Sequence, residues 1–223
     1  MSTINLEPIG SPVLNEPGVA RTFSLPETIE QAVGFVLLGL AAPVIGASAV
    51  AVAVLSRRSP FIAHLRVAKD AKPFWMLKLR TMWPVDGADH RPAWIERIIA
   101  DPEEDLKDPA DPRVRNWFAS FCRRHSIDEL PQLWHVARGD MSLVGPRPLT
   151  RTEIDRYYAE DAPELLSVKP GLTGLWQICG RSAIRFPRRA AMDLELVRSL
   201  TPRIYLKILA RTIPAIIWGS GAW

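Results

Sequence analysis

The sequence contains little cysteine and little histidine, with two cysteines and four histidines among 223 residues. Two cysteines, Cys122 and Cys179, are too few for a disulfide framework and suit a protein of a reducing cytosol. Neither has the spacing of a metal site, and the histidines are scattered. The sequence therefore argues against a small disulfide-stapled domain and against a structural zinc site. With 48% hydrophobic and 23% charged residues, it supports one medium domain with an appendage.

Positive charge is scarce at the beginning of the chain. Residues 1–56 contain one arginine against four glutamates, so the remaining residues hold 27 Lys and Arg against 20 Asp and Glu. Within that remainder, residues 86–111 carry nine acids and three bases. Outside this acidic stretch, residues 57–223 have a net charge of about +13, which favours phosphates, acidic lipids or nucleic acid as partners.

Charge is absent altogether from residues 31–56, QAVGFVLLGLAAPVIGASAVAVAVLS. A straight helix of this length would reach about 39 Å, enough to cross a hydrocarbon core of roughly 30 Å. The stretch is too long for a cleaved signal peptide, and acids rather than bases precede it. We therefore expect it to insert into a membrane.

Pro43 lies in the middle of this stretch. A proline there lacks the backbone donor and clashes with the carbonyl of Gly39, so a kink is expected. Each half alone would reach about 20 Å, so the segment could enter and leave by the same face, or span as one helix with a tolerated proline. The residues alone do not separate these two interpretations. Arg57 and Arg58 follow, which places the C-terminal end on the cytoplasmic side.

Beyond Arg58 the pattern predicts short, mixed elements. Residues 73–83, PFWMLKLRTMW, are typical of a strand or hairpin arm. Residues 86–112 are acidic and punctuated by proline, which indicates a surface insertion with a short helix at 94–100. Two further helices are expected to meet at residues 126–129.

The second of these helices would begin at Asp128 as its N-cap and be closed by Arg138-Gly139. Residues 141–150 predict an extended run into a rigid turn, 151–166 a helix, and 169–182 a loop or strand. Residues 202–218 mix apolar side chains with Lys207 and Arg211. Such a helix could lie on a bilayer surface or pack in the core.

Two adjacent carboxylates, Asp128 and Glu129, stand at the start of the expected helix. Helix capping explains acids at this position, and so does a catalytic pair in which one acid attacks and the other holds a metal. Several basic residues are embedded in nearby motifs and could bind phosphate. They are Lys78, Arg80, Arg123, Arg147 and Arg181. Arg147 lies between two prolines that fix where its guanidinium points, and the arginine fork suits bidentate phosphate binding.

The run SIDELPQLWHVARGDMSLVGPRPLT, with KPFWMLKLRTM before it and KPGLTGLWQICGRS after it, resembles the bacterial sugar transferases. These are the monotopic polyprenyl-phosphate phosphoglycosyltransferases, and the resemblance runs from about Ala32 to Trp223. It implies an α+β, mostly helical fold at the cytoplasmic face of the bacterial inner membrane. The expected organisation is a tail (1–25), a re-entrant helix broken at Pro43 (26–58) and a catalytic domain (59–223) that ends in an interfacial helix.

The resemblance also implies an activity. Such enzymes transfer a sugar-1-phosphate from a UDP-sugar to undecaprenyl phosphate and release UMP, which begins the synthesis of exopolysaccharide, capsule, O-antigen or a related glycoconjugate. It allows a homodimer and implies contact with membrane lipids. It does not indicate which sugar is transferred.

The roles of individual residues follow from the same resemblance. Asp128 would attack the donor to form a covalent phosphosugar intermediate, and Glu129 would bind Mg²⁺. Lys78, Arg123 and Arg147 would contact phosphate, and Arg80 and Arg181 are assigned to the same group. Capping would then fall to Ser126 or to the backbone, so that Asp128 turns toward Arg123 and Arg147.

Two other functions are considered. Where relatives tend to read Q-x-R-x-G-x-x-G-K-P-F, this chain has HLRVAKDAKPF, beginning at His64. The lost glycines motivate a catalytically inactive, membrane-anchored scaffold for glycan assembly as the alternative. A nucleic-acid-binding protein is not favoured, because no binding motif is present and the tryptophans lie in apolar runs.

Overall fold

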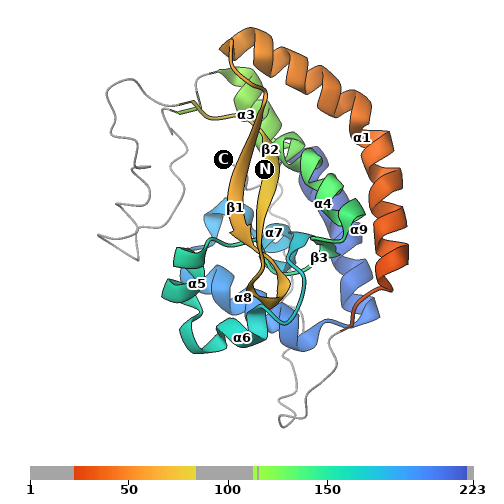
Figure 1. Cartoon of the computed structure of the whole chain (residues 1–223), viewed down its shortest axis with the longest axis vertical. Helices are drawn as coiled ribbons and strands as arrows, with labels where there is room; N and C mark the ends of the chain where they lie inside the picture. The colour runs from red at the N-terminus through yellow and green to blue at the C-terminus, as the bar shows by residue number, and fades with distance from the viewer. Residues whose placement is uncertain (1–22, 84–112, 115, 220–223) are drawn as a thin grey trace.

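The computed structural model describes residues 23–83, 113–114 and 116–219. Within these residues the fold is mostly helical with two small two-stranded sheets, so the predicted α+β class is confirmed. Figure 1 shows the long helix α1 (Glu27–Ser56) along one edge, with a β-hairpin through the middle of the molecule. Residues 1–22 of the tail and the whole predicted insertion at 86–112, with its expected helix at 94–100, lie outside the described residues.

Helix α1 contains the whole uncharged stretch and stays helical across Pro43. The expected break is therefore a bend within one helix, and Figure 1 shows that bend midway along its course. Its 30 residues are long and apolar enough to cross a membrane by length and composition, and only 17% of its most hydrophobic window is buried. Most of its apolar surface thus has no partner among the described residues.

Both halves of α1 nevertheless contact the rest of the molecule. In the first half, Glu30 and Gly34 are buried, and Gly34 lies directly against the backbone of helix α4 (Leu133–Arg138). In the second half, Val52 is buried in a cluster with Trp83 and Ala119. The helix is therefore attached to the same unit at two points.

The hairpin consists of β1 (Phe61–Val67) and β2 (Pro73–Leu79), joined by the short 3-10 turn η1 (Lys69–Ala71). The strands are antiparallel, and Ile62 pairs with Lys78 while His64 pairs with Met76. Because facing residues of paired strands lie on one side of a sheet, these four side chains share a face. The prediction of a strand or hairpin arm at residues 73–83 is confirmed for its first seven residues.

The region predicted as two meeting helices contains three elements. Helix α3 (Trp117–Arg124) is followed by a 3-10 turn, η2 (Ile127–Gln132), and then by α4. Gly139 closes α4 in the left-handed conformation at φ 86°, as predicted.

A second small sheet supports the turn that carries Arg147. Strands β3 (Ser142–Val144) and β4 (Gly171–Thr173) are parallel, which confirms the extended run. A Cβ at Gly171 would lie 2.1 Å from the nitrogen of Gly145, so two glycine backbones touch at this point. The prediction of loop or strand for 169–182 is wrong in part, because helix α7 (Leu175–Cys179) and the turn η4 (Arg181–Ala183) form there.

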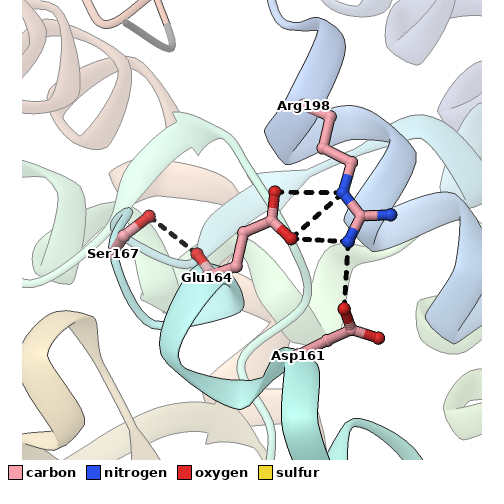
Figure 2. Close-up of polar contacts among 4 residues, drawn as sticks. All are labelled: Asp161, Glu164, Ser167 and Arg198. Atoms are coloured by element: carbon pink, nitrogen blue, oxygen red, sulfur yellow. Dashed lines mark hydrogen bonds and ion pairs between the residues drawn. The ribbon is translucent and has the colours of Figure 1, made fainter. Parts of the chain in front are cut away.

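The end of the molecule away from α3 is built from helices. Their bounds are α5 (Arg151–Tyr157), η3 (Ala159–Asp161), α6 (Ala162–Leu165) and α8 (Phe186–Ser199). A capping box between Thr150 and Glu153 starts α5. Figure 2 shows how Arg198 of α8 binds both Glu164, at 2.6 Å, and Asp161, at 2.9 Å. These exposed ion pairs contribute little energy but fix the orientation of α6.

The last helix, α9 (Pro202–Trp218), has two faces of different character. Tyr205 and Ile208 are buried in the main core, whereas Leu206, Ile213 and Ile217 are exposed. The two interpretations of this segment therefore apply to its opposite faces. One face packs in the core, and the other leaves apolar side chains uncovered.

One buried acid links these helices to the turn after β3. Asp193 of α8 is 1% exposed and accepts a hydrogen bond from the hydroxyl of Tyr158 at 3.0 Å. Burial raises the pKa of this carboxyl to about 7, although the hydrogen bonds from Tyr158 and from the backbone N–H of Arg147 oppose the rise. The neutral acid is thus favoured in the folded state.

We expect Gly34→Ala to destabilise the protein and Gly46→Ala to leave it unchanged or stabilise it. A Cβ at Gly34 would lie 2.8 Å from the nitrogen of Ala137, whereas nothing lies within 4 Å at Gly46. Overpacking costs about 1–3 kcal/mol, while Gly→Ala in a helix otherwise gains up to about 1 kcal/mol. Thermal unfolding of the two variants in the same detergent measures the difference. Equal shifts would mean that α1 does not pack on α4.

We expect Asp193→Asn to stabilise the protein more at pH 8 than at pH 5. The folded pKa lies above the unfolded value of about 3.9, so the folded state binds the extra proton and the wild type loses stability as pH rises from about 4 to 7. Asparagine keeps an acceptor for Tyr158 but cannot ionise. Comparing the unfolding midpoints of the two proteins at both pH values isolates this group. A constant difference would show that Asp193 does not titrate in this range.

Candidate active site

The carboxylate pair lies in the 3-10 turn between α3 and α4. Asp128 is 7% exposed and is the second residue of η2. Ser126 occupies the N-cap position with φ 54°, and its side chain makes no capping hydrogen bond. The first prediction, that Asp128 is an N-cap, is therefore wrong, because the chain tightens into a 3-10 turn before α4 begins. The backbone caps instead, since the carbonyl of Ser126 accepts the N–H of Glu129 at 3.1 Å.

Glu129 is paired with the predicted lysine of the hairpin. The Nζ of Lys78 lies 2.6 Å from Oε1 of Glu129, and both side chains are largely shielded from water. Lys78 comes from β2 and Glu129 from η2, so this ion pair joins elements that are 51 positions apart in sequence. The hairpin and the 3-10 turn thus meet at a charge pair.

His135 holds the hairpin in the position that this pair requires. Its Nε2 accepts the backbone N–H of Leu77 at 3.1 Å, and its Nδ1 lies 3.3 Å from Asp140. A neutral imidazole that accepts a hydrogen bond at Nε2 carries its proton on Nδ1. The Nδ1–H of His135 can therefore donate to the carboxylate of Asp140. Burial lowers the pKa of His135, which favours this neutral form. His135 was not predicted as a site residue.

The side chain of Arg181, from η4, points toward the turn that carries the carboxylate pair. Its guanidinium donates to the hydroxyl of Ser126 and to the backbone carbonyls of Arg124 and Ala215. Burial lowers the pKa of Arg181, whereas the negative charges of Glu129 and Asp128 act to raise it. The structure therefore places Arg181 where it supports the turn that carries the carboxylate pair, and its predicted contact with phosphate stays a prediction.

Arg147 is fixed by its neighbours. Its Cζ lies 5.6 Å from the centroid of the Trp176 ring, and its charge and its backbone N–H act on Asp193. Asp193 and Trp176 are both buried. Trp176 and Asp193 thus hold the turn between the prolines in place. An arginine that binds phosphate in a fixed orientation would require such support.

His64 marks the point where several cations share one environment. Desolvation lowers the pKa of His64 to about 4, and so do the charges of Arg66, Lys78, Arg147 and Arg80, in that order. Desolvation is the largest cause, and the four cations act in the same direction. The hairpin face and the Arg147 turn therefore form one positively charged surface beside Glu129.

The two remaining predicted arginines have different positions. Arg80 donates to the backbone carbonyls of Ser59 at 2.9 Å and Phe61 at 3.4 Å, so its guanidinium ties the residue after β2 to the start of β1 and to the link that precedes it. It contributes charge to the surface around His64 but is engaged with the backbone. Arg123 lies in the last turn of α3, three residues before Ser126, the N-cap residue of η2.

Four polar residues of this region were missed as site residues: Glu30, His64, His135 and Asp193. Glu30 and Asp193 looked like ordinary helical acids, since burial is not visible in a single sequence. His64 could have been found from the hairpin alternation, which places it two residues from Arg66 on the face of Lys78. No local pattern marks His135, because its partner Leu77 is far away in sequence.

The donor atoms suit a metal with few protein ligands. No group of three or more His, Cys, Asp or Glu side chains gathers within the part of the chain that the structure describes. Two adjacent carboxylates are present at residues 128–129. Mg²⁺ commonly uses one or two carboxylates and completes its shell with phosphate oxygens and water, so the pair fits this ion better than zinc.

The chain is similar to known proteins over most of its length. A UDP-galactose-lipid carrier transferase of Erwinia amylovora is 37% identical over 171 residues, covering 74% of this chain and 35% of that protein. An undecaprenyl-phosphate galactose phosphotransferase of Salmonella typhimurium is 37% identical over 166 residues, or 72% of this chain and 34% of that protein. The chain thus spans about a third of the length of these two relatives.

A relative of similar size is also found. The exopolysaccharide production protein ExoY of Rhizobium meliloti is 37% identical over 169 residues, covering 74% of this chain and 73% of that protein. The profile of the family described as bacterial sugar transferase matches residues 22–219, which include helices α1 and α9 and every predicted site residue. The chain belongs to the bacterial sugar transferase family.

Proposed function

We propose that this protein transfers a sugar-1-phosphate from a UDP-sugar to undecaprenyl phosphate and releases UMP. The names of the relatives supply the class of acceptor and of sugar. The observation that carries the proposal is the buried Asp128 beside the Glu129–Lys78 pair, next to a surface formed by several cations. A carboxylate among fixed positive charges suits an attack on a diphosphate.

The first step forms a covalent intermediate on Asp128. A carboxylate oxygen attacks the phosphorus that bears the sugar, the new O–P bond forms, and the P–O bond to the uridine side breaks. UMP leaves with the electron pair of that bond. The developing negative charge is spread over phosphate oxygens, which Lys78 and Arg147 can neutralise.

The second step returns the enzyme to its starting state. A phosphate oxygen of undecaprenyl phosphate attacks the same phosphorus and displaces the Asp128 carboxylate. The product is a sugar linked to the lipid through a diphosphate. Because the acceptor oxygen is already anionic, no general base is needed, and none of the described residues has to serve as one.

Mg²⁺ is the metal that this donor set fits, and Glu129 would hold it with oxygens of the substrate diphosphate. When bound, the ion would neutralise charge on that diphosphate. The ammonium group of Lys78 already lies 2.6 Å from Oε1 of Glu129, so this carboxylate already binds one positively charged group. We expect Lys78 to shift toward phosphate when donor and metal enter.

We also propose that α1 is re-entrant and that the catalytic unit lies on the cytoplasmic face of the inner membrane. Gly34 packs on α4, while Val52 packs beside Ala119 of α3. A helix fixed to one soluble unit by both halves cannot place its ends on opposite sides of a bilayer without leaving one contact. The bend at Pro43 and the exposed apolar face support this topology.

Helix α9 offers a second membrane surface. Its exposed apolar side chains are Leu206, Ile213, Ile217 and Trp218. Exposed leucine, isoleucine and tryptophan on one amphipathic helix are typical of a helix at the lipid interface. We infer that α1 and α9 together hold the site near the lipid acceptor.

We expect Asp128→Asn to abolish UMP release. Asparagine keeps the size of the side chain but cannot act as a carboxylate nucleophile, so the rate should fall at least about a thousandfold. The assay combines purified protein, Mg²⁺, undecaprenyl phosphate and a panel of UDP-sugars. Asp155→Asn, on the exposed surface of α5, is the matched control and should retain full activity.

Two results of that assay would contradict the proposal. UMP release that survives Asp128→Asn would exclude the covalent step on this residue. Wild-type protein that releases no UMP from any donor in the panel would favour the scaffold alternative.

We expect a cysteine at Thr3 to be labelled only from the cytoplasmic side. The background replaces Cys122 and Cys179, and a second cysteine at the exposed Asp155 reports the side of the catalytic unit. With a re-entrant α1, both positions react with an impermeant maleimide only after the inner membrane is opened. Labelling of the Thr3 position in intact spheroplasts would mean a spanning helix.

A further inference from the structure

A buried carboxylate joins the two membrane-facing helices to the strand that precedes the Arg147 turn. Glu30 of α1 is 6% exposed. Its Oε1 accepts hydrogen bonds from the backbone N–H of Leu143 at 2.9 Å, the hydroxyl of Ser142 at 2.5 Å and the hydroxyl of Tyr205 at 2.7 Å. One oxygen of α1 is thus shared between β3 and α9.

The hydrogen bonds of β3 explain why a hydrogen-bond acceptor is needed there. The N–H groups of Ser142 and Gly145 donate toward the β4 side, to Pro170 at 2.8 Å and Thr173 at 3.0 Å. The N–H of Leu143 donates to Glu30 instead. A buried N–H without a partner is costly, so Glu30 satisfies an edge of the sheet that no third strand among the described residues covers. An unpaired buried carboxylate would be equally costly, and its three donors offset that cost.

The same strand determines where Arg147 stands. Leu143 is two residues before Gly145, whose backbone is in contact with that of Gly171. Because this close approach leaves no room for adjustment, a displacement of β3 carries the following turn with it. We propose that Glu30 is a positioning residue for Arg147. Through Glu30, the positions of α1 and α9 determine the position of the phosphate-binding turn. This inference rests on the proposed function, in which Arg147 binds the donor diphosphate.

The test compares Glu30→Ala and Glu30→Gln with Glu27→Gln. Glu27 lies one turn earlier on the same helix and makes exposed contacts with Lys169 and Gln31, so it is a matched control. We expect Glu30→Ala to raise the KM for the UDP-sugar about tenfold or more, because a hydrogen bond to a charged group is lost. Glu30→Gln keeps an acceptor and should stay within about threefold of wild type. A purely structural role would lower kcat through loss of folded protein and leave KM unchanged, which would overturn the proposal.

A double-mutant cycle shows whether Glu30 acts through Arg147. In an Arg147→Ala background, Glu30→Ala should change the remaining activity by less than about twofold, because the positioned group is already gone. Additive losses would overturn the proposal. If Glu30→Ala does not fold, Tyr205→Phe removes one of the three donors and is put through the same cycle.

Hydrogen exchange separates this inference from the proposed function. Exchange of the amides in residues 142–149 should be faster in Glu30→Ala than in Glu27→Gln, whether or not the protein transfers a sugar phosphate. Equal exchange in the two variants would overturn the positioning role. Absence of UMP release from wild-type protein, together with faster exchange in Glu30→Ala, would reject the activity and leave the structural coupling standing.

Discussion

A two-stranded hairpin is not stable alone in water, and the site depends on how β1 and β2 are held to the helices. The contacts that provide this attachment include Lys78 with Glu129, Leu77 with His135, and Arg66 with Glu153 of α5. The first contact is made by a residue to which we assign a role in the chemistry, and the other two place it. The ion pair therefore joins the folding of the hairpin to the assembly of the site.

The distribution of charge explains why such ties are needed. Lys78, Arg66, Arg80 and Arg147 all act on His64, so like charges are gathered within one environment. Mutual repulsion would separate them without anchors. Arg66 is held by Glu153 at 3.6 Å, and Arg147 by the ring of Trp176 and the buried Asp193. A surface with this fixed positive charge favours the binding of a multiply charged anion, and a diphosphate is such an anion.

Much of the fold follows from patterns that act over a few residues. The uncharged stretch, the bend at Pro43, the hairpin arm at residues 73–79 and the closing Gly139 all have local physical causes, and each is found. The missed helix α7 begins after Gly174 in a segment whose glycines favour a turn, and the burial of Trp176 in the core overrides that preference. The 3-10 turn was missed because Asp128 is as good an N-cap by composition as any residue in the chain.

Motifs in the sequence draw attention to charged residues of the candidate site but not to the residues that hold them. Lys78, Glu129 and Arg181 belong to such motifs, and their roles stay predictions. His135, Asp193 and Glu30 bind partners at least 30 positions away or buried backbone groups, so nothing near them in sequence indicates a role. Long-range pairing and burial arise only when the chain is folded, which is why the supporting residues had to come from the structure.

The support of the turn at residues 126–132 has a consequence for its stability. Ser126 and Arg181 both have left-handed backbone conformations, at φ 54° and φ 51°, and their side chains are hydrogen-bonded to each other. Non-glycine residues in this region carry a strain of about 1–3 kcal/mol each, which the surrounding structure must sustain. Glycine at either position would relieve that strain and remove the bond that holds the turn. The turn thus combines a less stable backbone with a firmly held geometry, so a substitution chosen for thermal stability alone would loosen it.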